Sequence, residues 1–108
     1  MSAPFVAALR SRPDTIRLAP ADATDIITIR VEVPELWDVV RVVTRPGEPV
    51  LGVKTAALAV LDSGADPRGY VTKLRGFEVL DEQHSLADVG AVNGSIFLLT
   101  NRRRRPVR

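Results

Sequence analysis

Two strand-like segments open the ordered part of the chain. Apolar residues occupy every second position over residues 27–33, and polar residues lie between them. This period of two is typical of a strand with one buried face. A valine-rich run over residues 37–44 follows after a short connection that contains Pro34. The two runs are predicted to pair as a hairpin, with Val40 and Val42 facing the core.

The next segment has the period of a helix. Pro49 suits the first helical position, where its missing N–H group is not needed, and Gly64 is a usual stop. The apolar residues between them recur at helical spacing and lie on one predicted face: Val50, Val53, Ala57, Leu58 and Leu61. The sequence therefore predicts one main helix after the hairpin.

The remainder of the chain alternates short strands with tight turns. Further strands are predicted over residues 70–74, 77–80 and 95–101. The Ser85-x-x-Asp88 spacing is typical of a capped helical turn, and Asn93-Gly94 is typical of a tight turn. One helix on a mixed sheet is the simplest two-layer core for these elements, so the expected architecture is an α+β roll.

Length and composition indicate a single domain with two terminal segments. A chain of 108 residues, 45% of them apolar, is enough for one small core. Residues 1–24 contain three prolines and no sustained period, so we interpret them as a flexible N-terminal arm. The folded domain is expected over residues 25–101, and residues 102–108 form a basic tail.

Several function classes have no support in the sequence. There is no cysteine and no apolar run of about 18 residues, and the first residues do not resemble an export signal. A cytoplasmic monomer is expected. His84 stands beside Ser85 and near Asp88, but on a short capped turn the serine is better used as a cap. No metal-ligand spacing and no phosphate-binding glycine loop is present, so we expect neither an enzyme nor a cofactor.

The positive charge of the chain is concentrated in the tail. Five arginines lie in residues 102–108, so the net charge of +2 for the whole chain leaves −3 for residues 1–101. The run from Arg102 through Arg103 and Arg104 to Arg105 has three interpretations, which stay open: a phosphate-binding arm for nucleic acid, an arm that docks on an acidic protein, and a solvated end. No aromatic residue is interleaved with these arginines, which counts against a grip on single-stranded nucleic acid.

The second half of the chain resembles a known family. The stretch LRGFEVLDEQHSLADVGAVNGSIFLL contains the pattern Leu80-x5-Leu86-x-Asp88-x-Gly90-x2-Asn93-Gly94 before a strand. This pattern, together with the element order, resembles ubiquitin-like β-grasp proteins. It is most similar to the small bacterial YukD-like group associated with type VII secretion, which shares the Gly-x-x-Asn-Gly turn. The resemblance implies one main helix packed on a mixed four- to five-stranded sheet.

The resemblance also implies a function and a surface. Conjugated members of the family end in Gly-Gly, and this sequence has no such pair. A non-catalytic adaptor or accessory subunit that binds a protein partner is therefore expected. A modifier in a bacterial conjugation pathway and a nucleic-acid-associated protein are the alternatives. The family's docking patch would comprise Trp37 (or Leu36), Val71, Lys73, Leu98 and Thr100, with Arg102 to Arg105 beside it. Strand alternation adds Ile96 to the same face as Leu98.

Overall fold

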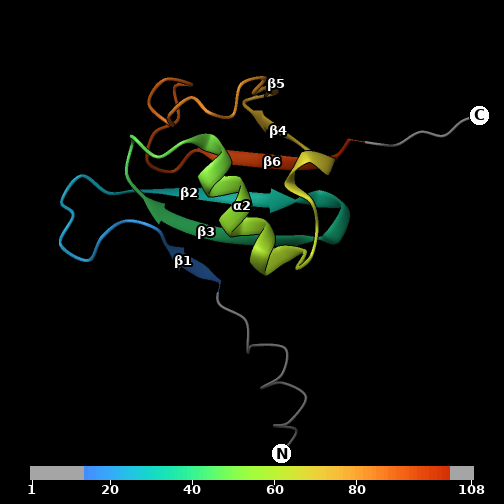
Figure 1. Ribbon diagram of the computed structural model, residues 1–108, viewed down its shortest axis with the longest axis horizontal. Helices are drawn as coiled ribbons and strands as arrows, with labels where there is room; N and C mark the ends of the chain where they lie inside the picture. The colour runs from blue at the N-terminus through green and yellow to red at the C-terminus, as the bar shows by residue number, and fades with distance from the viewer. Residues whose placement is uncertain (1–13, 103–108) are drawn as a thin grey trace, which may run out of the picture.

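The computed structural model describes residues 14–102, and the first and last residues of the chain lie outside this range. The described residues form a sheet with an α-helix lying across it, and two short 3-10 helices lie at the end of the sheet where β6 ends (Figure 1). The elements are β1 Thr15–Arg17, β2 Ile27–Val33, η1 Pro34–Leu36, β3 Asp38–Thr44, α2 Val50–Leu61, η2 Pro67–Gly69, β4 Tyr70–Leu74, β5 Phe77–Glu78 and β6 Ile96–Asn101.

The sheet is mixed and has the strand order β1-β3-β2-β6-β4-β5. β2 and β3 form the predicted antiparallel hairpin, and β6 enters beside β2 in parallel. β4 pairs antiparallel with β6 and, on its other side, with β5. Helix α2 connects β3 to β4 and lies on one face of the sheet, so the chain forms the α+β roll that the hydrophobic pattern predicts (Figure 1).

The core lies between α2 and the face of the sheet that α2 covers. Alternate residues of β2, β3 and β6 point into it, and each of them is almost completely buried: Ile29, Val31, Val33, Val40, Val42, Phe97 and Leu99. The apolar face of α2 packs against them, as its helical spacing predicts. Burying one such side chain contributes about 1.5–3 kcal/mol. The same alternation leaves the intervening residues of each strand on the opposite face.

The start of α2 is fixed by the loop that precedes β6. Pro49 is the residue before the first helical turn, with φ −63° and ψ 147°, and not its first residue. The N–H of Val50 donates to the carbonyl of His84 at 2.9 Å, and the N–H of Leu51 donates to the carbonyl of Glu82 at 2.8 Å. These bonds satisfy N–H groups that a helix leaves unpaired at its start. They hold residues 82–84 against the helix.

The turns of the second half follow their sequence signatures. The N–H of Asp88 donates to Ser85 Oγ at 3.1 Å, which is the predicted cap. The side chain of Asn93 accepts a hydrogen bond from the N–H of Thr28 at 2.8 Å, and the N–H of Gly94 donates to the carbonyl of Thr28. The turn before β6 is therefore fixed to β2. The fourth expected strand is shorter than predicted, because only Phe77–Glu78 pair with β4.

The structure differs from the expectation for residues 14–24, which we assigned to a flexible arm. Residues 15–17 form β1, parallel to β3, and Ile16 packs against the core. The N–H groups of Leu18 and Ala19 both donate to the carbonyl of Val43. β1 occupies the backbone edge of β3 and raises the number of strands to six, where four or five were expected. Three residues are too few to show a period, which is why the pattern did not indicate this strand.

Candidate protein-docking surface

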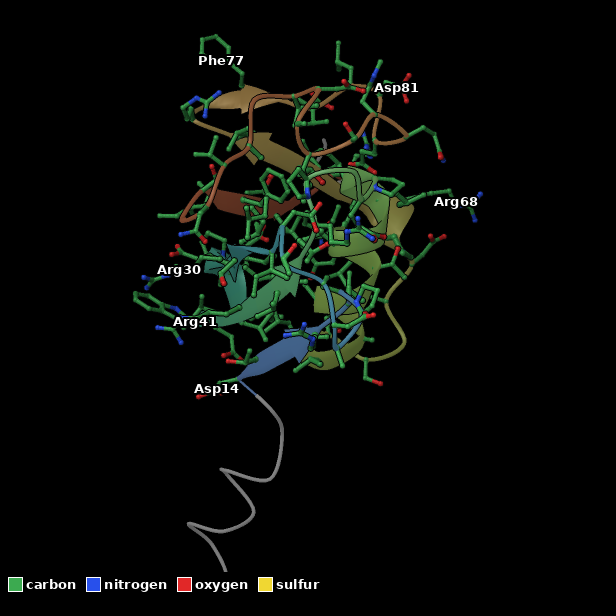
Figure 2. All side chains as sticks on the ribbon, turned by 90° about the vertical axis from the view of Figure 1, so that its left-hand side faces the viewer. Asp14, Arg30, Arg41, Arg68, Phe77 and Asp81 are labelled. Carbon is green, nitrogen blue, oxygen red and sulfur yellow. The ribbon has the colours of Figure 1, made fainter. Side chains whose placement is uncertain are left out.

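The face of the sheet opposite α2 is the candidate surface, and we call it the open face. Figure 2 shows the sheet with α2 on one side and the side chains of Arg30 and Arg41 projecting from the other. Its residues alternate with the core residues of each strand, and they are exposed or half-buried. They are Thr15 and Arg17 of β1, Thr28, Arg30 and Glu32 of β2, Val39, Arg41 and Val43 of β3, Val71 and Lys73 of β4, Glu78 of β5, and Ile96, Leu98 and Thr100 of β6.

The structure brings four of the predicted docking residues together. Lys73 lies directly opposite Leu98, and Val71 lies directly opposite Thr100, across the antiparallel pair of β4 and β6. Directly opposed residues on one face have their Cβ atoms about 4.5–5.5 Å apart, so these side chains are in contact range. Leu98 also lies beside Glu32 of β2. The surface around Leu98 is therefore apolar at its centre and charged on both sides.

Trp37 lies in the connection between β2 and β3, at one end of the open face. Its side chain is 95% exposed, and its backbone is left-handed, with φ 54° and ψ 40°. Its N–H donates to the carbonyl of Pro34 at 3.0 Å. The carboxylate of Glu35 accepts the N–H of Asn101, so this connection is held at the end of β6. A bulky residue with positive φ is a backbone outlier, and such strain is concentrated at functional positions.

The arginines of the tail are placed only in part. The N–H of Arg102 donates to the carbonyl of Gly69 at 2.8 Å, and its Nε donates to the carbonyl of Arg68 at 3.0 Å. This side chain is therefore held at η2, where the chain leaves the sheet, and not over Leu98. Arg103, Arg104 and Arg105 lie outside the described residues.

The sequence did not indicate a buried polar cluster behind the sheet. Lys54 of α2 is 1% exposed, although it stands among the apolar residues of the helix. Its Nζ donates to the carbonyl of Tyr70 at 2.6 Å and to both carboxylate oxygens of Glu82, at 2.9 and 3.0 Å. Thr72 Oγ1 donates to the same carboxylate at 2.7 Å. All three ammonium donors have partners, so the cluster joins the helix to β4 and to the loop and leaves no ammonium donor of Lys54 for chemistry.

Tyr70 extends these polar contacts to the end of the helix. Its hydroxyl donates to Asp62 Oδ2 at 2.8 Å. Burial of the ring, and then the hydrogen bond to Asp62, raise the pKa of Tyr70 to about 12. The phenol is thus held in its neutral form, and it anchors the C-terminal end of α2 to the start of β4.

Of the three residues that superficially suggest a nucleophilic triad, His84 and Asp88 lie close together, but the hydroxyl of Ser85 serves as a cap. The imidazole of His84 lies between two carboxylates, with Nε2 3.4 Å from Asp81 Oδ2 and Nδ1 3.6 Å from Asp88 Oδ2. Ser85 Oγ is used as the cap. Within residues 14–102 no group of three or more His, Cys, Asp or Glu side chains is arranged to hold a metal ion. In the same range no helix is long and apolar enough to cross a membrane.

Comparison with solved structures identifies the architecture. The chain matches the ubiquitin-like domain of an Arabidopsis thaliana protein, with a TM-score of 0.64 and 16% identity over 81% of this chain and 88% of that one. It also matches the C-terminal ubiquitin-like domain of mouse tubulin-specific chaperone e, with a TM-score of 0.65 and 12% identity over 82% of this chain and 100% of that domain. A protein designed on ubiquitin matches with a TM-score of 0.62 and 15% identity over 80% of this chain and 100% of the design.

Sequence comparisons add no closer relation. No protein-family model matches the chain, and no curated protein matches it. Identities of this size show the fold alone, and a fold does not carry a function. The family resemblance of the second half is thus confirmed at the level of the architecture. The chain has the ubiquitin-like β-grasp fold.

Proposed function

We propose that this chain is a non-catalytic ubiquitin-like adaptor that binds a protein partner through its open face. The observation that carries the proposal is the cluster of Val71, Lys73, Leu98 and Thr100 on adjacent strands. Trp37 stands fully exposed at the end of the same face. Aromatic anchors beside aliphatic side chains, with charged groups around them, are typical of the centre and rim of protein interfaces.

The partner side of the proposal comes from the sequence pattern. The Gly90-x2-Asn93-Gly94 turn and the strand after it are similar to YukD-like proteins, and they favour an accessory subunit of a bacterial assembly, with type VII secretion as the leading context. We place it in the cytoplasm as a monomer. The arginine run from Arg102 to Arg105 would steer the approach of an acidic partner, since long-range attraction raises association rates more than it raises affinity.

A capture experiment with matched baits tests the proposal. Full-length protein, the Leu98→Asp variant, the Ala59→Asp variant and a bait that stops at Asn101 would each be incubated with host lysate, with and without nuclease. Leu98 lies half-buried on the open face, and Ala59 is exposed on the outer side of α2, so the two aspartates mark opposite faces of the domain. We expect a defined protein to bind the full-length and Ala59→Asp baits and to be lost with Leu98→Asp.

Two results would contradict the proposal. Equal capture by the Leu98→Asp bait would show that the open face is not the interface. Loss of all capture on nuclease treatment would favour the interpretation that the tail binds nucleic acid. In that case the affinity for nucleic acid should also fall steeply with salt concentration. Retention of the partner by the bait that stops at Asn101 would remove only the steering role of the arginines.

A further inference from the structure

Two arginines of the open face lie as close as a sheet allows. Arg30 of β2 and Arg41 of β3 are directly opposite in the antiparallel pair. Their N–H groups point away from each other, because that of Arg30 donates to the carbonyl of Ser95 and that of Arg41 donates to the carbonyl of Asp14. They therefore form a non-hydrogen-bonded pair, in which the Cα atoms are only about 4.5 Å apart and the side chains are closest. Figure 2 shows both side chains projecting to the same side, away from α2.

The repulsion between these two arginines opposes folding, and ion pairs within the described residues neutralise only one of the two charges. Like charges directly opposite each other in a sheet are destabilising. Arg30 has a partner in Glu32, with Nε 3.0 Å from Oε2. Arg41 makes no ion pair with any residue in the described range 14–102. One exposed guanidinium is therefore left beside another cation.

Apolar side chains lie next to each of the two arginines. Ile96 lies beside Arg30 in the neighbouring strand, and Val39 and Val43 flank Arg41 along β3. On the side of Trp37, a shallow hollow is lined by Arg30, Glu32, Pro34, Trp37, Asp38 and Val39. A ligand that enters this hollow therefore contacts Arg30 together with Trp37 and Val39.

We propose that Arg30 and Arg41 form a carboxylate-binding site, and that the partner of the open face is an acidic protein segment with Asp or Glu next to apolar residues. A carboxylate between the two guanidinium groups would remove their repulsion and accept paired hydrogen bonds from the planar fork of Arg41. This inference rests on the proposed function, because it specifies the chemistry of the partner at the same face.

The charges on the face favour a protein carboxylate over a nucleic-acid backbone. Glu32 lies next to Arg30 along β2, and Glu78 lies opposite Lys73. Two carboxylates on the same face repel a continuous polyanion at several points, whereas a single carboxylate between the arginines meets Glu32, whose charge is already paired with Arg30. Aliphatic neighbours suit a peptide side chain better than a row of phosphates.

Titration with a matched pair of peptides tests the site. One short synthetic peptide alternates Glu with Leu and Ser, and the other carries Gln in place of each Glu. Binding to full-length protein would be followed by the NMR signals of the arginine Nε–H groups and the backbone amides. We expect the Glu peptide to bind about ten- to hundredfold more tightly than the Gln peptide, with shifts centred on Arg30 and Arg41. Arg41→Gln should weaken its binding about tenfold or more.

The control is an exposed arginine on another face. Arg68 is exposed and pairs with Asp66 at η2, on the side of α2 (Figure 2). Arg68→Gln should leave the affinity for the Glu peptide unchanged. Equal affinity for the two peptides, or equal losses from Arg41→Gln and Arg68→Gln, would overturn the inference. So would an oligonucleotide of equal charge that binds as tightly as the Glu peptide and depends on Arg41.

The inference and the proposed function can fail separately. If Leu98→Asp abolishes capture of a lysate protein while Arg41→Gln leaves that capture and the peptide affinity unchanged, the open face is the interface and the carboxylate site is wrong. If Arg41→Gln lowers the affinity for the Glu peptide while Leu98→Asp leaves the capture of the lysate protein unchanged, the carboxylate site is supported and the proposed interface is wrong. Arg41→Gln removes a repulsion between like charges, so the thermal unfolding midpoint of this variant should not fall. A loss of peptide affinity in the variant would then not be due to misfolding.

Discussion

The two faces of the sheet are built from alternate residues of the same strands, yet their side chains follow different rules. The face under α2 carries Ile, Val, Leu and Phe that are almost completely buried. The open face carries an arginine pair, Glu32, Lys73 and scattered aliphatic residues. If the open face had been selected for stability alone, opposed arginines would be a poor choice. The comparison shows that one face holds the fold together, and it agrees with our proposal that the other face binds a partner.

The largest expected effect of a single substitution comes from the covered face. Phe97 is completely buried, and its neighbour Leu98 is on the open face. Phe97→Ala should lower the free energy of unfolding by about 3–5 kcal/mol, because it removes apolar contacts and leaves a cavity. Leu98→Ala should lower it by less than about 1 kcal/mol. Denaturant unfolding of both variants measures the contrast, and equal losses would break the distinction between the faces.

A second effect tests the buried ion pair behind the sheet. Lys54→Met leaves the carboxylate of Glu82 without its ammonium partner, so we expect a loss of about 2–4 kcal/mol. The double variant Lys54→Met with Glu82→Leu removes both charges and should recover part of that loss. Urea unfolding of the two variants is the measurement. A double variant less stable than Lys54→Met would show that the pair acts through Thr72 or through packing.

The third effect is a pH dependence of stability from Tyr70. Its folded pKa of about 12 lies above the ordinary value of 10.0. The folded protein holds the phenol proton of Tyr70 more tightly than the unfolded chain does. The contribution of this proton to the free energy of unfolding is therefore complete below pH 10 and is lost as the pH rises from 10 to 12. The free energy of unfolding should therefore decline over this pH range. Tyr70→Phe should remove this part of the alkaline decline, and an unchanged decline in the variant would contradict the assignment.

The smallest effect concerns the strained tryptophan of the open face. Glycine adopts positive φ without a steric penalty, so Trp37→Gly should be more stable than Trp37→Ala by about 1 kcal/mol. Both variants should lose partner binding, since each removes the exposed indole. Thermal unfolding and capture from lysate measure the two quantities. If Trp37→Gly keeps its partner, the indole is not part of the interface.

Much of the fold could be predicted from the hydrophobic pattern, because its elements are long enough to show a period. The hairpin, α2 and β6 follow from alternation and helical spacing, whereas the expectation that Leu98 and Lys73 share a surface came from the family resemblance. β1 could not be predicted in this way, because three residues show no period. The strand edge of β3 with which it pairs is known only from the three-dimensional structure.

The arginine pair and the cluster around the buried lysine could not be predicted from the sequence. Alternation turns Arg30 and Arg41 outward, but only the strand register places them opposite each other. Lys54 interrupts the apolar face of α2, and this interruption was the one signal that could have revealed the cluster with Glu82. The relation to YukD-like proteins stays a prediction, because the structural matches concern the fold.

Site-specific photo-crosslinking in the host tests the central claim most directly. A photoreactive phenylalanine analogue would replace Leu98 on the open face or Ala59 on the outer side of α2, in full-length protein. We expect a discrete, nuclease-resistant protein adduct from position 98 that weakens with Arg41→Gln, and no such adduct from position 59. An adduct of equal strength from position 59, or none from position 98, would contradict the claim that the open face is the docking surface.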